Sequence, residues 1–353
     1  MPFITPTFED IRSAILRDIL NLNPEADTGV DSDYFVRASS VASVATGIYQ
    51  YQGWIVRQIF PDTADTEFLE WHARTRNLSR KSATTASGTL TVTGEPGATA
   101  AAGYTATRGD LSYTTTAAVT LDSAGNGTVA ASFATAGTAG NTTAAASGTF
   151  TATPVGFDST VIMGVMSGGT DAETDAELLA RLLDIIRRPP AGGNKYDFRR
   201  WAMSIDGVTA AYVYPLRRGL GTVDVVVTSA DGLPSAAIIA VVQAYIDDVR
   251  PVTAKNCLVL APTLKTVDMH ISVSLNGVTL DVATAEIKSA VAEYIDKLNP
   301  GDTFIRSQAE MLVSAVTGVV DRDIVTPAAN VIPAVNETVV EWIRTGTITV
   351  SLL

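Results

Sequence analysis

The stretch GGTDAETDAELLARLLDIIRRPP, Gly168 to Pro190, decides the interpretation of the chain. Four acidic residues stand at alternate positions in it: Asp171, Glu173, Asp175 and Glu177. Such a run can hold a metal ion, supply a catalytic carboxylate pair, or begin a helix. The first two alternatives indicate a metalloprotein or an enzyme, and the third indicates a structural element.

The residues after the acidic run exclude a calcium loop of the helix–loop–helix kind. That loop needs a glycine at its sixth position and a carboxylate at its twelfth, but these positions hold Ala176 and Leu182. Glu173 and Glu177, one helical turn apart, would lie about 5–6 Å from each other, as in a retaining glycosidase. However, no apolar neighbours are present to raise the pKa of one of them.

A helix start explains every residue of the stretch. Thr174 and Glu177 form a capping box, and acidic residues favour the positive end of the helix dipole. A leucine-rich stripe follows, and Pro189 ends the helix just beyond Arg187 and Arg188. We therefore expect a capped helix, with no catalytic residue, no bound metal and no cofactor.

Composition excludes other classes of function. The 353 residues carry a net charge of −12, which disfavours nucleic acid and an anionic membrane surface as partners. No apolar run is long enough to span a bilayer. The single cysteine, Cys257, cannot form an internal disulfide, as is typical of proteins made in a reducing cytoplasm.

The patterns along the chain predict a multidomain α+β protein. We expect an N-terminal helical bundle segment over 1–82 and a small Thr/Ala-rich β domain over 83–165. Two related α+β modules follow, over 166–262 and 263–353. In the first segment, apolar residues recur every turn after Thr7, a candidate N-cap. The helix expected next is long and rich in small residues, which allow close helix packing.

The β domain is predicted from alternation in 88–94 and 127–133. It has few large apolar residues, so we expect a thin domain that needs a neighbour to bury its faces. A disordered linker is the alternative.

The two C-terminal modules are predicted from internal repeats. The segments 241–251 and 290–300 both contain Tyr-Ile-Asp followed by a proline, and 198–215 resembles 309–327. The second pair shares a helical run, a Gly-Val step and a strand closed by proline, with Gly207 and Gly318 as helix-terminating residues. The order of the repeated pieces differs, which excludes a simple tandem duplication.

Remaining motifs give weaker indications. Gly219 and Gly221 precede a strand, so a hairpin explains them better than a dinucleotide loop. Arg217 and Arg218 would lie at its tip, either as solvated charges or as partner contacts. The two histidines, His72 and His270, are far apart in the sequence and indicate no metal site.

Two further features concern binding surfaces. Four aromatic residues of the helical segment are interface candidates, although core packing is the commoner use of such side chains: Trp54, Phe60, Phe68 and Trp71. The Arg-Gly-Asp sequence at 108–110 fits a β-loop better than an adhesive site.

The order of these segments resembles the baseplate J-like proteins of contractile phage tails. The resemblance includes Gly140-Asn141 after a β segment, Gly168-Gly169 with Asp171, Glu173 and Asp175 leading into a helix, and the downstream AGGNKYDFRRWAMSIDGVTAAYVYP. It extends over nearly the whole chain. Each motif alone is unspecific, and their order carries the likeness.

This resemblance implies a structural component of a baseplate wedge, located in the virion and assembled in the host cytoplasm. It implies contacts of the N-terminal helices with a second copy and a smaller wedge protein. The C-terminal domains would join neighbouring wedges into a ring around the hub, near the sheath-initiator protein, and rearrangement of this ring would release sheath contraction. The alternatives are a glycan hydrolase that uses the acidic run and a receptor-binding tail protein that uses the Thr-rich segment.

Overall fold

The computed structural model describes residues 5–230 and 232–353. The chain forms two compact units. The first contains the residues up to Arg80 together with Glu173–Pro189, and the second contains Lys81–Ala172 and Pro190–Leu353. The helix that follows the acidic run therefore belongs to the N-terminal unit. Our placement of this helix in a domain over 166–262 was wrong.

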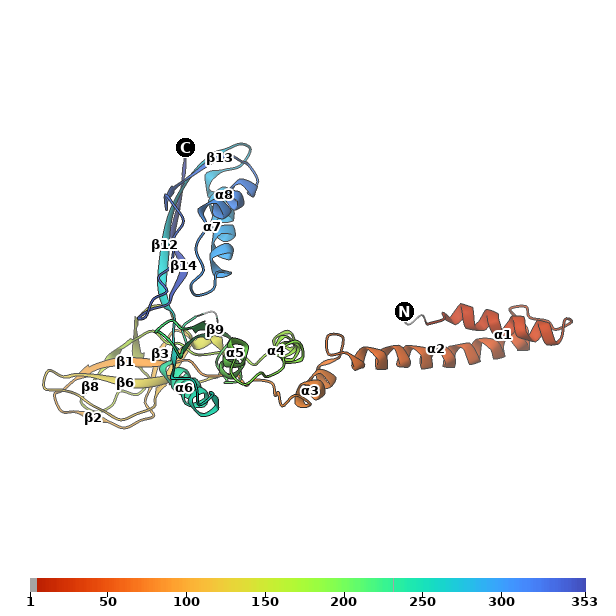
Figure 1. Cartoon of the computed structure of the whole chain (residues 1–353), viewed down its shortest axis with the longest axis horizontal. Helices are drawn as coiled ribbons and strands as arrows, with labels where there is room; N and C mark the ends of the chain where they lie inside the picture. Colours follow the sequence, from red (N-terminus) through yellow and green to blue (C-terminus); the bar gives the residue numbers. More distant parts are fainter. Residues whose placement is uncertain (1–4, 231) are drawn as a thin grey trace. The chain divides into compact units, whose positions relative to one another are not determined.

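The first unit is helical, as the sequence predicted. Its helices are α1 (Phe8–Leu22), α2 (Asp33–Ile59), α3 (Thr66–Arg74) and α4 (Asp175–Arg187). Thr7 caps α1 in a capping box with Asp10. Figure 1 shows α1 folded back along the first part of α2. Ala38 and Ala42 of α2 are fully buried, since small side chains let the two helices approach closely.

Helix α4 packs on α3 because leucines meet between them. The buried residues of this small core are Leu69, Ala73, Leu78, Leu178 and Leu182. Periodicity predicted the buried stripe of α4 but not its partner, since α3 lies a whole β domain earlier in the sequence.

The second unit begins with a β-barrel. Its strands are β1 (Ser87–Gly94), β3 (Thr105–Arg108), β4 (Leu111–Thr115), β6 (Asn126–Phe133), β7 (Ala146–Phe150) and β8 (Phe157–Met163). They close in the order β1-β6-β4-β3-β7-β8, with every pair antiparallel. Two short strands, β2 (Thr99–Ala100) and β5 (Val119–Thr120), pair beside it, and a 3₁₀ turn, η1 (Thr138–Gly140), follows β6.

The barrel buries its own core, so a thin domain that depends on a neighbour was a wrong expectation. Closure gives every strand two partners and leaves no open edge. Leucine, phenylalanine, tyrosine and methionine side chains, set among alanines and valines, then fill the narrow interior. Tyr113 is fully buried, and its hydroxyl donates to the Gly140 carbonyl at 2.9 Å.

Two α+β modules complete the second unit. The central module consists of α5 (Lys195–Met203), β9 (Ala210–Pro215), β10 (Thr222–Thr228), α6 (Ala236–Val249) and β11 (Asn256–Leu260). The C-terminal module consists of β12 (Thr263–Leu275), α7 (Leu280–Asp296), α8 (Arg306–Ala315), β13 (Val319–Thr326) and β14 (Glu341–Leu352). In Figure 1, α7 and α8 cover one face of the C-terminal sheet.

The two modules share one arrangement in permuted order. Each sheet has a central strand with one antiparallel and one parallel neighbour: β9-β10-β11 and β13-β12-β14. The repeated Tyr-Ile-Asp lies on α6 and α7, and its isoleucines, Ile246 and Ile295, are both fully buried. Gly207 and Gly318 have the left-handed φ of +84° and +85°, but α5 and α8 already end at Met203 and Ala315. The glycines lie in the turns that follow, closed by Val208 N–H to the Ile205 carbonyl and by Val319 N–H to the Val316 carbonyl, so their expected place directly after the helix cap was wrong.

Among the described residues, no helix combines the length and the apolar character that crossing a membrane requires.

We predict that the barrel core is sensitive to the loss of one side chain. Leu90 of β1 is fully buried, whereas Val155 is 94% exposed. Leu90→Ala should lower the free energy of unfolding by about 2–5 kcal/mol, because it leaves a cavity. Val155→Ala should change it by less than about 0.5 kcal/mol. Urea denaturation of the full chain measures both, and equal effects would contradict the barrel assignment.

Candidate interface surfaces and the acidic run

The four carboxylates of the acidic run do not converge. Asp171 accepts hydrogen bonds from the backbone N–H and the hydroxyl of Thr138, both at 3.0 Å. Glu177 accepts from the Thr174 N–H at 2.8 Å and completes the capping box, which confirms the expected helix start. The described residues contain no group of three or more His, Cys, Asp or Glu side chains placed to hold a metal ion.

Glu173 forms a buried ion pair that the sequence did not predict. Both of its carboxylate oxygens accept from Arg181 Nη1, at 2.6 and 2.7 Å. The Glu173 side chain is 4% exposed and the Arg181 side chain 12%. A carboxylate held in this way is fixed within the fold and is poorly placed to meet a substrate.

Arg80 links α3 to the start of α4. Its guanidinium donates to Glu70 at 2.9 Å, to the Glu173 carbonyl at 2.6 Å and to Asp175 at 2.5 Å. Hydrogen bonds from the Thr66 hydroxyl and from Arg80 hold the pKa of Asp175 below its ordinary value. The acidic run therefore fixes α4 to the N-terminal unit.

Helix α2 carries an uncovered apolar seam. Five large apolar residues are spaced alternately three and four residues apart and are 42–67% exposed: Val41, Val44, Ile48, Tyr51 and Ile55. We call this set the α2 seam. The spacing is that of the contact positions in a coiled coil. No charged residue lies between Arg37 and Arg57, so this part of α2 has the character of a helix-packing surface.

The aromatic interface candidates lie around the corner between α2 and α3. Trp54, Phe68 and Trp71 form a ladder with ring centroids 5.4 and 4.9 Å apart, and Trp54 Nε1 donates to Asp65 at 2.7 Å. Trp54 and Phe68 are half-buried in this ladder, whereas Phe60 and Trp71 are 58% and 47% exposed. Their part in an interface stays a prediction.

Arg217 and Arg218 are not the solvated charges that a hairpin tip suggested. The glycines do form the predicted hairpin between β9 and β10, but both guanidiniums turn back to the carboxylate of Asp224, at 2.6 and 2.7 Å. Asp224 is fully buried and the Arg217 side chain is only 4% exposed. The missed signal was an aspartate inside the valine-rich strand, six and seven residues after two arginines.

The remaining candidate residues have separate local partners. His72 Nε2 lies 2.8 Å from the Gln58 carbonyl, and His270 Nε2 lies 3.1 Å from the Ser351 hydroxyl. Burial raises the pKa of Cys257 to about 12, which keeps its thiol protonated and unreactive. Arg108–Asp110 forms the exposed turn between β3 and β4.

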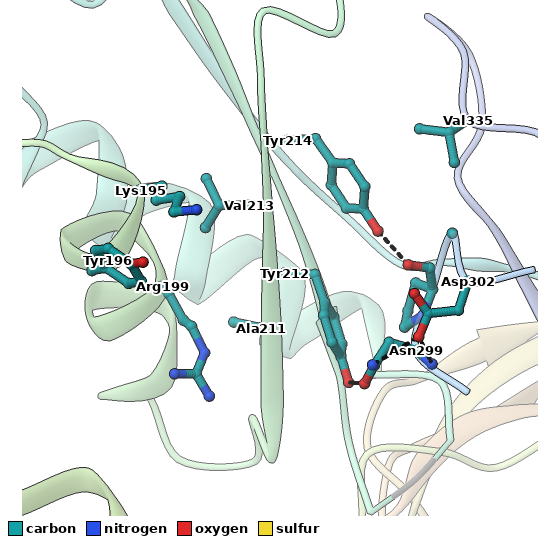
Figure 2. Close-up of a pocket in the computed structure, with 12 residues that line it drawn as sticks. Lys195, Tyr196, Arg199, Ala211, Tyr212, Val213, Tyr214, Asn299, Asp302 and Val335 are labelled. Atoms are coloured by element: carbon teal, nitrogen blue, oxygen red, sulfur yellow. Dashed lines mark hydrogen bonds between the residues drawn. The ribbon is translucent and has the colours of Figure 1, made fainter. Parts of the chain in front are cut away.

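A cleft of about 420 Å³ lies where the central and C-terminal modules meet. Helix α5 and strand β9 line one side of it, and the segment 299–302 lines the other. Figure 2 shows Tyr212 and Tyr214 on the face of β9 that looks toward Asn299 and Asp302. The opposite face of β9 looks toward α5.

The entrance to α5 is built around a buried carboxylate. Asp197 is 1% exposed and accepts from the backbone N–H groups of Ala191, Gly193 and Asn194 at 2.7–3.2 Å. Burial opposes its ionisation, but the three N–H groups and Arg200 outweigh burial and hold its pKa below the ordinary value.

Comparison with known families matches three parts of the second unit. The baseplate J-like protein barrel domain matches residues 89–169, the baseplate J-like central domain matches 190–261, and the baseplate J-like protein C-terminal domain matches 267–351.

Two relatives match most of the chain at 34% identity. The Mu-like prophage FluMu protein gp47 of Haemophilus influenzae aligns over 303 residues, 82% of this chain and 84% of the relative. Baseplate protein gp47 of Escherichia phage Mu aligns over 310 residues with the same coverage. The anti-feeding prophage baseplate contains a chain that is 10% identical with a TM-score of 0.36, covering 94% of this chain and 90% of that one. That likeness is too low to support a conclusion.

We predict that removing Arg181 destabilises the N-terminal unit, because the buried Glu173 carboxylate would lose the hydrogen bonds that Arg181 donates to both of its oxygens. Arg181→Ala should cost about 3–5 kcal/mol. Arg37→Ala is the control, because the side chains of Arg37 and its partner Asp33 are 75% and 73% exposed. It should lower the free energy of unfolding by about 1 kcal/mol or less. Urea denaturation followed by circular dichroism at 222 nm measures both free energies of unfolding. An Arg181→Ala variant as stable as the parent would contradict the buried ion pair.

Asp197 should make stability depend on pH. Because its folded pKa lies below the ordinary 3.8, its contribution is complete above that value and is lost as pH falls through the folded pKa. At neutral pH, Asp197→Asn should cost about 1–3 kcal/mol. The difference between the two proteins should shrink under acid, as thermal melts at stepped pH would show. A difference that stays constant as the pH falls would contradict this assignment.

Proposed function

This chain belongs to the baseplate J-like family, with relatives in Mu-like phages, and from that premise we propose that it is a structural part of a baseplate wedge. In this proposal it joins wedges into a ring around the hub of a contractile tail. It takes part in tail assembly, and rearrangement of the ring triggers contraction of the sheath. The protein is part of the virion and is assembled in the host cytoplasm.

The observation that supports this proposal best is the α2 seam. A helix with a continuous apolar stripe that its own unit leaves uncovered needs a partner helix. The seam from Val41 to Ile55 extends over about 21 Å, enough for two heptads of coiled-coil packing. We propose that the α2 helices of two copies and a helix of a smaller wedge protein pack along it. Phe60, directly after α2, and Trp71, on α3, add exposed aromatic surface to the same unit.

The second unit supports the ring-forming part of the proposal. The barrel and both modules have cores of their own, so they can act as rigid bodies that change neighbours without unfolding. We propose that the C-terminal domains contact the neighbouring wedges, and that other faces meet the hub and sheath-initiator proteins.

The contacts of the carboxylates in the acidic run support a role without catalysis. A glycosidase needs two carboxylates facing a shared space. Glu173 is instead paired with Arg181, and Glu177 caps its own helix. We infer that the chain acts through its surfaces and is not an enzyme.

The proposed assembly predicts the effect of one charge on the α2 seam. Ile48→Glu places a carboxylate among the apolar contacts and should weaken association by about tenfold or more. Gln50→Glu adds the same charge off the seam, at another exposed position of α2, and should leave association unchanged. Mass photometry of the full chain, alone and mixed with the neighbouring tail proteins, measures the species. A parent chain that stays monomeric in every mixture would contradict the proposal.

A further inference from the structure

The central and C-terminal modules meet through polar contacts and not through a shared core. Their hydrophobic clusters have no member in common: one contains Phe198, Val225 and Ile246, and the other contains Ile271, Ile295 and Phe304. The chain between β11 and β12 consists of Ala261 and Pro262 alone. Whatever holds the two modules in one orientation must therefore be found at their surfaces.

Three side chains of β9 and its hairpin donate hydrogen bonds to the C-terminal module. Alternate residues of a strand point to the same face, and Tyr212 and Tyr214 do so here, as Figure 2 shows. The Tyr212 hydroxyl donates to Asn299 Oδ1 at 2.9 Å, and the Tyr214 hydroxyl donates to the Pro300 carbonyl at 2.5 Å. Burial, aided by Asp302, raises the pKa of Tyr214 to about 12, so this hydroxyl keeps its proton.

Arg217 makes the third contact. Its Nη1 donates to the carbonyls of Asn336 and Val339. These carbonyls belong to a tight turn that the Asn336 side chain closes by accepting from the Val339 N–H at 3.1 Å. Arg217 is held in position by its Nε, which donates to buried Asp224. Its buried Nη2 has no hydrogen-bond acceptor in the part of the chain that the structure describes.

We propose that Tyr212, Tyr214 and Arg217 form a releasable clamp that holds the C-terminal module against the central module, and that its release lets the C-terminal module swing about Ala261 and Pro262. The clamp consists of a few hydrogen bonds to backbone carbonyls and one amide. Such contacts can be exchanged for water without exposing a hydrophobic core, and interfaces of this polar kind permit relative motion of domains. The 420 Å³ cleft beside the tyrosines leaves their side of the interface incompletely packed. This inference does not rest on the proposed place of the protein in a tail.

The test measures the distance between spin labels on the two modules of the full chain. The labels are placed by Ala240→Cys on α6 and Ser289→Cys on α7, both at exposed positions. Native Cys257 is buried and has a pKa of about 12, so it stays unlabelled. Pulsed electron spin resonance then gives the distance distribution.

Two clamp variants are compared with one control in this background. The double variant Tyr212→Phe/Tyr214→Phe removes only the two hydroxyls, and Arg217→Gln removes the cation while Arg218 still pairs with Asp224. Tyr245→Phe, on α6 and 37% exposed, is the control.

The parent and the control should give one narrow distribution, and both clamp variants should give a broader one shifted to longer distances. If circular dichroism shows that Arg217→Gln does not fold, the distance distribution of the double tyrosine variant still tests the proposal. Folded clamp variants with the distribution of the parent would overturn the proposal.

Discussion

The attachment of α4 to the N-terminal unit requires that Arg80 and Arg181 neutralise the acids at the start of this helix, so that its leucines can pack on α3. Without Arg181, the buried Glu173 carboxylate would lose the hydrogen bonds donated to both of its oxygens, and a poorly compensated buried carboxylate is costly in a fold. With both arginines, the chain leaves the second unit at Ala172, adds one helix to the N-terminal unit, and enters the second unit again at Pro190. An acidic run that resembled a metal loop thus serves to fix a helix.

Pairing of buried charges also distinguishes the interior of the protein from the exposed face of α2. Charges that could bind an ion or a substrate are paired inside the protein: Glu173 with Arg181, and Asp224 with Arg217 and Arg218. The surface of α2 instead presents valine, isoleucine and tyrosine. Other charges, such as those of Arg37 and Asp33, stay exposed, so the uncharged stretch of α2 between Arg37 and Arg57 is a local feature of that helix.

Local patterns in the sequence predicted the local features. The capping box of Thr174 and the hairpin at Gly219 and Gly221 each depend on neighbouring residues alone. Two missed ion pairs, Glu173–Arg181 and Asp224–Arg217, join residues only eight and seven positions apart, but the other misses involve residues far apart in sequence. Closure of the barrel pairs β1 with β8. Arg80, which contacts the start of α4, and Asn336, which contacts Arg217, each lie about a hundred residues from their partner along the chain. No periodicity encodes such distances, although the isolated Asp224 in a valine strand did signal a buried ion pair.

Hydrogen–deuterium exchange on the isolated chain and on the same chain in assembled tails tests the central claim most directly. The claim is that the uncovered face of α2 is the functional surface, while the acidic run is internal structure. The account predicts that the amides from Val41 to Ile55 gain protection on assembly, and that those from Glu173 to Arg181 are protected equally in both states. Unchanged exchange along α2, with altered exchange around Glu173, would contradict it.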